Sequence, residues 1–364
     1  MTKYISHHPF IFLFSLLLVA SVFLGGVSIL FSVGNSRPLP ATYLATETTR
    51  SIGVIESTPT NPAPIEIPTI YQPTTSATFT VTTWADATLT NTPTLSVKTI
   101  TKTVSDLGKP LVVTFIDVGQ GDSILIVSPE GLTMLIDGGS GDSGVVTFLR
   151  GMKVSRIDIM VATHPHEDHI GGLIQVLEAM SIGRVVTNGQ SHTTATYEHF
   201  LDAILNSGAE YSEVRRGDTF TLGVMNFLVL NPGISLVDDL NENSIVLQLK
   251  YDETTFLFMG DAGFDTENSM IKAGMPLRAN ILKVGHHASC SATSWSFLQA
   301  VHPSVGIYSA GINNQYGHPC TETIDRLAQT GAMVLGTDVF GSITIIVDQN
   351  GYEIFDSNGK EIVR

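Results

Sequence analysis

Residues 162–172 read ATHPHEDHIGG and place three histidines and two carboxylates within six positions. The apolar run directly before them, IDIMVAT (157–163), predicts a buried strand. The run that follows, IGGLIQVLEAM (170–180), has apolar residues at helical spacing and predicts a helix. The polar cluster therefore lies where a strand ends and a helix begins, a position at which rigid scaffolds present functional loops.

The spacing within this cluster is typical of a metal site. His164 and His166 alternate at the strand end, so a turn can aim both imidazoles at one point. Asp168 and His169 open the helix and form a second pair of ligands. A lone histidine is more often a core or surface residue, but His-x-His-x-Asp-His after an apolar strand is not expected by chance. Histidine with carboxylate suits zinc, and additional oxygen donors suit manganese or iron.

Four further groups follow other predicted strands. Asp137 ends the strand in LIDGG, and Asp261 ends the strand in FLFMGD. His286 and His287 follow the strand in LKVGHHAS, and His318 lies in the turn NNQYGHP. Each one alone reads as a capping aspartate or a loop histidine, but their shared position predicts one site. In that site Asp137 would orient a metal-bound histidine or a nearby loop, and Asp261 would bridge two metal ions.

Strand and helix signals alternate along residues 106–364, and their order indicates the fold class. LVVTFIDVG (111–119), SILIVS (123–128) and LTMLIDGG (132–139) predict early hairpin strands separated by turn residues. Strand and helix units follow, and the same order then repeats from MNFLVLNP onward. We therefore expect an α/β (α+β) domain with two packed sheets and helices outside them.

The N-terminal segment predicts a membrane anchor. Residues 10–33 are mostly Phe, Leu, Val and Ile, and 4–36 contain no Asp, Glu, Lys or Arg. A spanning helix needs ~20 apolar residues, whereas the apolar core of a cleaved signal usually has ~7–15. Lys3 favours a cytoplasmic N-terminus. We expect 1–36 to form a cytoplasmic stub and a single-pass transmembrane signal-anchor, with the remainder extracellular. The alternative is a protein secreted after signal cleavage.

Residues 37–105 predict a disordered linker, and 106–364 predict an acidic catalytic domain. The stretch 41–105 contains 20 threonines and six prolines and shows little periodicity, which is typical of stalks and tethers. The domain carries 30 acidic and 14 basic side chains, a net charge of −16. A globally basic surface for nucleic acid is therefore excluded, so a phosphate must meet metal ions or a local patch.

The motifs resemble those of the metallo-β-lactamase superfamily. Within it they are most similar to the ComEC-type branch, the hydrolase domain attached to bacterial DNA-uptake channels. The resemblance covers about 111–348 and rests on motifs in the order of that branch: FIDVGQGDSILI, LIDGG, THPHEDHIGG, NENSIVLQL, FLFMGD, LKVGHHAS and NNQYGHP. It implies an αββα sandwich with a site for two metal ions, zinc or manganese, along one edge of the paired sheets.

The resemblance also implies roles for individual residues. The expected metal ligands are His164, His166, Asp168, His169, Asp261 and His287. His164 and His166 would hold one ion. Asp168 and His169 would hold the other, and Asp261 would bridge the two ions. Either His286 or His287 would complete the second site. We favour His287 as the ligand and expect His286 to face the substrate.

One ligand of the wider superfamily is missing. A histidine is usual between the His-rich motif and the bridging aspartate, but His192 and His199 lie in or beside a predicted helix, far from the relevant strand. The matching place reads LNENS, so Asn241 or Asn243 would stand in, as is usual for the ComEC-type branch. Because asparagine is a weak neutral ligand, the first site would be looser and more tolerant of manganese.

The two cysteines follow two of the candidate histidines. Cys290 lies three residues after His287, and Cys320 lies two after His318. If both histidines border one cavity, the cysteines are neighbours, and an exported chain permits a disulfide. We expect a disulfide that joins the two loops. The alternative is a pair of free, buried thiols.

The expected activity is hydrolysis of a phosphodiester by a hydroxide that bridges the two metal ions. Asp168 serves as a ligand in this reaction, and His286 and His318 would hold a phosphate oxygen or protonate the leaving group. The substrate would be extracellular DNA handled for a separate uptake channel, because one apolar segment cannot itself conduct DNA. Alternatives are a wall-polymer phosphodiester, as in phosphorylcholine esterases, a β-lactam or other acyl substrate, and a tethered non-catalytic binding module. The sequence leaves the oligomeric state open.

Overall fold

The computed structural model describes residues 109–363, which is almost all of the expected catalytic domain. The expected membrane anchor (1–36) and linker (37–105) lie outside the described residues. Within 109–363, every helix is too short or too polar to cross a membrane.

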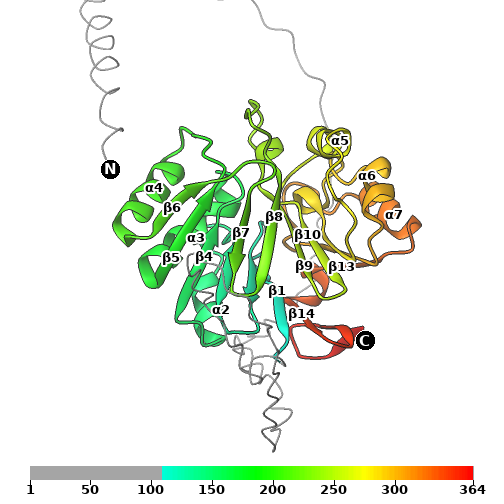
Figure 1. The fold of residues 1–364 in the computed structure, drawn as a ribbon, viewed down its shortest axis with the longest axis horizontal. Helices are drawn as coiled ribbons and strands as arrows, with labels where there is room; N and C mark the ends of the chain where they lie inside the picture. The colour runs from blue at the N-terminus through cyan, green and yellow to red at the C-terminus, as the bar shows by residue number, and fades with distance from the viewer. Residues whose placement is uncertain (1–108, 364) are drawn as a thin grey trace, which may run out of the picture. The chain divides into compact units, whose positions relative to one another are not determined.

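Two β-sheets form the centre of this domain (Figure 1). The first has nine strands in the order β16-β15-β14-β1-β2-β3-β4-β5-β6, and the second has seven in the order β13-β12-β11-β10-β9-β8-β7. The nine-stranded sheet contains β1 (Leu111–Phe115), β2 (Ile124–Val127), β3 (Thr133–Ile136), β4 (Arg156–Val161), β5 (Ser181–Thr187), β6 (Glu210–Glu213), β14 (Ile343–Asp348), β15 (Gly351–Phe355) and β16 (Glu361–Val363). The seven-stranded sheet contains β7 (Thr219–Leu222), β8 (Met225–Asn231), β9 (Val246–Tyr251), β10 (Thr254–Phe258), β11 (Ile281–Lys283), β12 (Val305–Tyr308) and β13 (Met333–Gly336).

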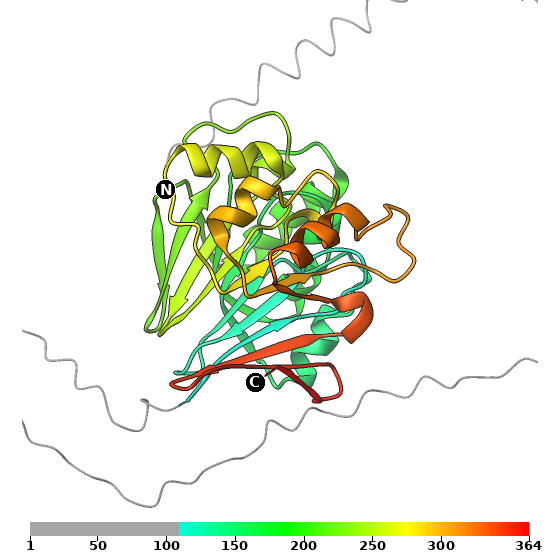
Figure 2. The ribbon, with the colours of Figure 1, turned by 90° about the vertical axis from the view of Figure 1, so that its right-hand side faces the viewer.

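Helices cover the outer face of each sheet (Figures 1 and 2). The nine-stranded sheet is covered by α2 (Val145–Gly151), α3 (Glu167–Ala179) and α4 (Ala195–Ser207). The seven-stranded sheet is covered by α5 (Phe264–Lys272), α6 (Trp295–Val301) and α7 (Thr321–Gln329). The short elements are η2 (Asn241–Asn243), η3 (Gly285–Ala288) and α8 (Thr337–Phe340). The four layers form an αββα sandwich.

Three buried apolar clusters account for this layering. The inter-sheet cluster takes Leu111, Val113 and Phe115 from alternate positions of β1, because successive strand side chains point to opposite faces. It also takes Phe227 and Phe256 from the opposite sheet. The other two clusters pack helices α2 to α4 and α5 to α7 against their own sheets. The expectation of two packed sheets with helices outside is confirmed.

Two features of the fold bring the loops of the site together. The neighbours β3 to β6 are mutually parallel, as are β10 to β13, so the carboxyl ends of each set meet at one edge. Helix α3 then packs closely behind that edge. A Cβ at Gly172 would overlap the carbonyl oxygen of Gly138, so only glycine permits this approach.

Some elements differ from expectation. Helix α3 begins at Glu167, three residues before its apolar periodicity begins, and Asp168 and His169 lie in its first turn as expected. Strand β6 was not predicted, because its sequence EYSE is polar and its residues are largely exposed at the sheet edge. Strand β5 was also missed, since Gly183 and Arg184 interrupt its apolar pattern.

Candidate metal centre

Four segments meet at the edge formed by the carboxyl ends of the parallel strands. The loop after β4 supplies His164, and the first turn of α3 supplies Asp168 and His169. The loop after β10 supplies Asp261, and η3, which follows β11, supplies His287. These segments come from both sheets, so the site forms only when the two sheets pack.

The first ligand group consists of His164, His166 and Asp261, whose potential ligand atoms all lie within 4.8 Å of one another. His164 Nε2 lies 2.9 Å from His166 Nδ1 and 3.8 Å from Asp261 Oδ2. His164 is buried, whereas His166 is partly exposed. The group therefore has one side turned toward solvent.

The second ligand group consists of Asp168, His169 and His287, which also lie within 4.8 Å. His287 Nε2 lies 3.5 Å from Asp168 Oδ2. Asp261 Oδ2 lies 3.3 Å from His169 Nε2 and 3.4 Å from His287 Nε2, so this carboxylate also contacts the second group. One aspartate thus lies between the two groups, as a bridging ligand must.

The residues fit two divalent cations. Among the described residues, His169 Nε2, His287 Nε2 and Asp261 Oδ1 are buried and have no hydrogen-bond partner. Buried polar atoms without partners are costly and rare in folded proteins. Both Nε2 atoms lie within 3.4 Å of Asp261 Oδ2, and imidazole nitrogen with carboxylate oxygen is a typical donor set for zinc or manganese.

The imidazoles of the first group are neutral before any cation binds. Burial lowers the pKa of His164 well below its ordinary value, and the nearby His169 lowers it further. Burial and His169 also lower the pKa of His166. The partners of His164 Nδ1 are hydroxyls: Thr163 Oγ1 lies at 3.1 Å and Ser244 Oγ at 3.4 Å.

The imidazoles of the second group are protonated before any cation binds. Burial acts to lower the pKa of His169 and His287, but carboxylates outweigh it and raise both values well above normal. For His169 the carboxylates are Asp261 and Asp137. The same contacts hold the pKa of Asp261 well below its usual range, although burial opposes them. A cation entering here therefore replaces protons.

Asp137 contacts His169 and orients its ring, which is one of the two tasks that the sequence suggested for this aspartate. Asp137 Oδ2 lies 2.8 Å from His169 Nδ1 and accepts a hydrogen bond from Thr163 Oγ1 at 2.7 Å. Asp137 Oδ1 accepts from the backbone N–H of Thr163 at 2.8 Å. With Nδ1 occupied in this way, His169 presents Nε2 to the site.

His286 and His318 lie at the exposed side of the site. His286 Nε2 is 3.8 Å from Asp261 Oδ2, and its side chain is 25% exposed, compared with 1% for His287. The rings of His286 and His318 have centroids 5.5 Å apart. Burial and the neighbouring histidines lower the pKa of His318 to about 4. The geometry thus puts His287, and not His286, in the second group of potential ligands.

Of the two candidate asparagines, only Asn241 reaches the site. Its Nδ2 lies 3.4 Å from His286 Nε2, and its buried Oδ1 has no partner among the described residues. Asn243 has a different task. Its amide bonds to Gln190 and to the backbone of Val237 and Asp239, so it shapes the loop and does not face the ligands.

Two neighbours of the site were not predicted from the sequence. The ring centroid of His192 is 6.1 Å from that of His166. Asp122 and Lys283 were not considered as site residues, although Asp122 lies 3.4 Å from His287 Nδ1. The available signal was a charged residue within each of the motifs GQGDS and LKVGHH. His199 takes no part in either ligand group.

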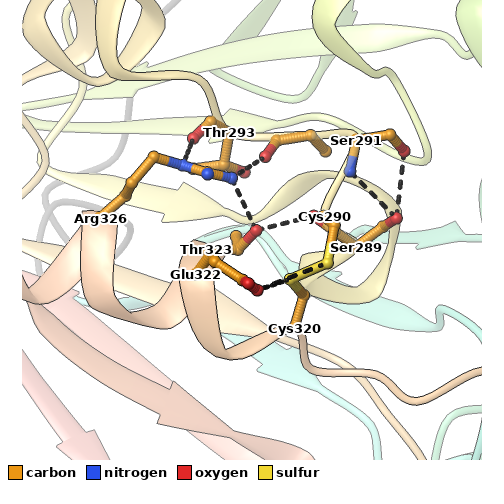
Figure 3. The surroundings of a disulfide bond; sticks show 9 residues. Ser289, Cys290, Ser291, Thr293, Cys320, Glu322, Thr323 and Arg326 are labelled. Carbon is orange, nitrogen blue, oxygen red and sulfur yellow. Dashed lines mark hydrogen bonds between the residues drawn. A yellow bond between two sulfur atoms is a disulfide. The ribbon is translucent and has the colours of Figure 1, made fainter.

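Cys290 and Cys320 form a disulfide, with Cα atoms 5.2 Å apart (Figure 3). It joins the segment after η3 to the first residue before α7. Hydrogen bonds reinforce the junction: Thr323 Oγ1 donates to Ser289 O, and Arg326 donates to two carbonyl oxygens of the same segment. The loops that carry His287 and His318 are therefore tied together.

A cleft of about 630 Å³ opens beside Asp168. Among the described residues that line it, four are acidic and none is Lys or Arg. The acidic residues are Asp117, Asp142, Glu167 and Asp168. Tyr316 also lines the cleft, is 59% exposed, and stacks on His318 with ring centroids 5.9 Å apart.

Comparisons with known proteins identify the family of this domain. The family model described as Metallo-beta-lactamase superfamily matches residues 116–311. ComE operon protein 3 of Bacillus subtilis (strain 168) is 29% identical over 250 residues, covering 64% of this chain and 32% of that protein. Competence protein ComA of Neisseria gonorrhoeae is 29% identical over 243 residues, covering 66% of this chain and 33% of that protein.

These relatives are ComEC-type competence proteins, so the resemblance found in the motifs is confirmed. The chain spans about a third of the length of each. Among solved structures, the metallo-β-lactamase fold protein YhfI from Bacillus subtilis is 13% identical, with coverage of 63% of this chain and 96% of that one and a TM-score of 0.44.

Proposed function

Because the chain belongs to the metallo-β-lactamase superfamily, we propose that it is a phosphodiesterase that works with two divalent metal ions, zinc or manganese. The observation that carries the proposal is the position of Asp261. Its Oδ2 lies within 3.8 Å of His164 in the first group and within 3.4 Å of both histidines of the second. When bound, two such ions lower the pKa of a water molecule and offset charge on a phosphoryl oxygen.

The residues around the two groups would bind and orient the phosphodiester. His318 is neutral at pH 7, because its pKa is lowered to about 4, and its Nδ1 has no partner among the described residues. A neutral imidazole with one free nitrogen is suited to holding an oxygen atom by a hydrogen bond, and a poor acid at pH 7. His286, whose ring is near His318, would contact the same phosphate.

The position of Tyr316 supports nucleic acid as the substrate. Its exposed ring stacks on His318 and borders the cleft beside Asp168. Stacking of a base on an aromatic side chain is worth about 1–3 kcal/mol and tolerates any base sequence. The competence-related relatives support the same choice and, with it, a role in DNA uptake beside a separate channel.

A smaller phosphodiester, such as a unit of a wall polymer, is the second candidate. The acidic side chains of the cleft favour it, because they repel the phosphates that flank a scissile bond in DNA. They would instead accept a substrate with a cationic group next to its phosphodiester. A β-lactam or other acyl substrate, or a non-catalytic binding role, has no comparable observation behind it.

For location we propose that the catalytic domain is extracellular and tethered to the cell membrane by residues 1–36. The support is the apolar length of residues 10–33. A disulfide within the domain is also typical of exported proteins.

The test uses the full-length protein, purified in detergent, stripped of metal and reloaded with zinc or manganese. Substrates are bis(p-nitrophenyl) phosphate, single- and double-stranded DNA, and p-nitrophenyl phosphorylcholine. Asp168→Ala should abolish cleavage, whereas Glu178→Ala, which removes an exposed carboxylate from the same helix, should not. DNA cleavage supports a nuclease, and cleavage of the choline ester alone supports the smaller substrate.

Two outcomes would contradict the proposal. Tight binding of two ions without cleavage of any of these esters would rule out a phosphodiesterase and favour the acyl or binding roles. Failure to bind any divalent ion would show that the two ligand groups are not a metal site.

A further inference from the structure

Lys283 is a charged residue in the apolar core. Its side chain is fully buried, and it occupies the last position of β11. Its neighbours across the sheet are Phe258 and Ile307, both of which belong to the inter-sheet cluster. Moving an ammonium group from water into such surroundings costs several kcal/mol unless a partner compensates for it.

The partner of Lys283 is Asp122, which lies in the loop before β2 of the opposite sheet. Lys283 Nζ is 2.6 Å from Asp122 Oδ2 and donates a hydrogen bond to the carbonyl oxygen of Val284 at 2.9 Å. This short distance is that of a direct, hydrogen-bonded ion pair.

Fold stability does not explain this pair. Replacing a buried ion pair by apolar residues of similar size is often neutral or stabilising, because the attraction barely offsets the loss of hydration. The residues directly before and after Lys283 in the sequence are apolar, so an apolar side chain would suit this position equally well. The ion pair therefore calls for a role beyond holding the sheets together.

The contacts of Asp122 indicate that role, since this one residue touches both loops of the second ligand group. Its Oδ1 lies 3.4 Å from His287 Nδ1. Its backbone N–H donates to the carbonyl oxygen of Asp168 at 3.3 Å. The residue before it packs equally closely, because a Cβ at Gly121 would overlap that same carbonyl oxygen.

His287 needs such support because its backbone is strained. His286, His287 and Ala288 are consecutive and all have left-handed φ values, of 48°, 53° and 60°. A non-glycine residue in this region is sterically strained and persists only when its surroundings hold it there. The disulfide between Cys290 and Cys320 fixes the chain just after this segment (Figure 3).

On the inner side, the ring of His287 is held at Nδ1. Its Nδ1–H donates to the carbonyl oxygen of Ser309 at 3.0 Å, with the Asp122 carboxylate beside it. This arrangement leaves Nε2 of His287 without a hydrogen-bond partner among the described residues. The atom lies 3.5 Å from Asp168 Oδ2 and 3.4 Å from Asp261 Oδ2.

We propose that Asp122 and Lys283 are positioning residues for the second divalent cation. Lys283 fixes the carboxylate of Asp122, and Asp122 fixes His287 through its side chain and Asp168 through its backbone. The inference rests on the second ligand group holding a metal ion, which is part of the proposed function. It adds that the affinity for this ion is set by a buried charge pair outside the ligands.

The test is a double exchange in the full-length, metal-stripped protein: Lys283→Met, Asp122→Leu, and both together. Each single change leaves one buried charge without its partner and should lower the Tm. The double variant should regain the Tm of the unmodified protein. Calorimetric titration with Zn²⁺ should nevertheless show the second ion bound about 10–100-fold more weakly in all three variants, and the first ion unchanged.

Several results would overturn the proposal. One is a double variant that binds both ions as the unmodified protein does, since the pair would then be only structural. Another is an equal loss of affinity for both ions. If the double variant does not fold, Asp122→Asn decides the matter, because it keeps the shape and a carbonyl acceptor for Lys283. Asp122→Asn should lower the affinity for the second ion about tenfold, and an unchanged affinity would contradict the proposal.

A matched control and a separate readout keep the two proposals apart. Asp158→Leu breaks the Arg156–Asp158 ion pair, which is partly exposed and remote from both ligand groups, and should leave both affinities unchanged. Because the titration contains no substrate, two ions bound without phosphodiester cleavage would contradict the proposed function and leave this inference standing.

Discussion

The first and second ligand groups contain similar side chains in different surroundings. Behind His164 of the first group are the hydroxyls of Thr163 and Ser244. Behind His169 and His287 of the second group are buried carboxylates, at 2.8 Å and 3.4 Å. Asp261 contacts histidines of both groups.

This difference shows how neighbours decide the charge of a buried imidazole. Burial without a carboxylate behind the ring lowers the pKa of the first-group histidines, so they accept a cation without releasing a proton. Carboxylates raise the pKa of the second-group histidines, so cation binding there must displace protons. The second group is also held in place more firmly, because a charged partner binds an N–H more strongly than a hydroxyl does.

Loss of Asp261 should have the largest effect, because it removes the one carboxylate that both groups contact. In Asp261→Ala we expect neither ion to bind tightly and phosphodiester cleavage to fall by about 10³-fold or more, which corresponds to about 4 kcal/mol. Metal content after dialysis and initial rates measure the two effects. Asp265→Ala, which removes an exposed carboxylate four residues later, is the control. Retention of two tightly bound ions in Asp261→Ala would disprove the shared role.

Removing the charge behind His169 should separate the two groups. Asp137→Asn keeps the shape and suits the left-handed backbone at this position, where φ is 57°. We expect the second ion to bind about 10–100-fold more weakly and the first ion to bind as before. The matched change is Ser244→Ala, which removes a neutral partner of His164. It should lower the affinity for the first ion by less than about tenfold. Equal losses in the two variants would mean that the charged partners confer no advantage.

Adding a ligand to the first group should make the groups more alike. Asn241→His would place an imidazole where a neutral amide now lies 3.4 Å from His286. We expect about tenfold tighter binding of the first ion and a shift in preference from manganese toward zinc, because imidazole is the better zinc ligand. Competitive titration with the two metals measures this change. In Asn241→Ala, binding should be no tighter than in the unmodified protein, and a gain there would refute the explanation.

A change of pH is the mildest perturbation and requires no substitution. The raised pKa of His169 and His287 contributes stability that is complete below pH 6.5 and is lost as pH rises through the raised values. The lowered pKa of Asp261 contributes stability that is present above pH 3.8 and is lost as pH falls through the lowered value. These groups should therefore make the metal-free domain most stable to urea between pH 3.8 and 6.5.

Metal should remove the alkaline part of this profile. With both groups occupied, the histidines no longer carry the protons whose loss weakens the fold, so stability should not decline just above pH 6.5. Urea unfolding at a series of pH values, with and without zinc, measures the difference. A metal-free protein that becomes more stable between pH 6.5 and 8 would contradict the assigned charges.

The sequence predicted the strands with strong apolar patterns and the helices with a clear apolar face. It did not predict β6, whose polar and largely exposed residues pair with β5 at the edge of the sheet. The apolar periodicity alone would start α3 at Ile170, three residues too late, because the polar residues of the first turn carry no helical periodicity. Backbone pairing and helix starts depend on neighbours that a local pattern does not contain.

The residue types of the site were determined by the sequence, since the motif THPHEDH and the polar groups after strands identify the candidates. The choice between neighbours was decided only by the tertiary structure. His287, not His286, is buried beside Asp168 and Asp261, whereas the His286 side chain is 25% exposed. Asn241, not Asn243, reaches the site because the second amide is used to close its own loop. The pairing of Asp122 with Lys283 required both sheets, because the two residues are distant in sequence and meet only where the sheets pack.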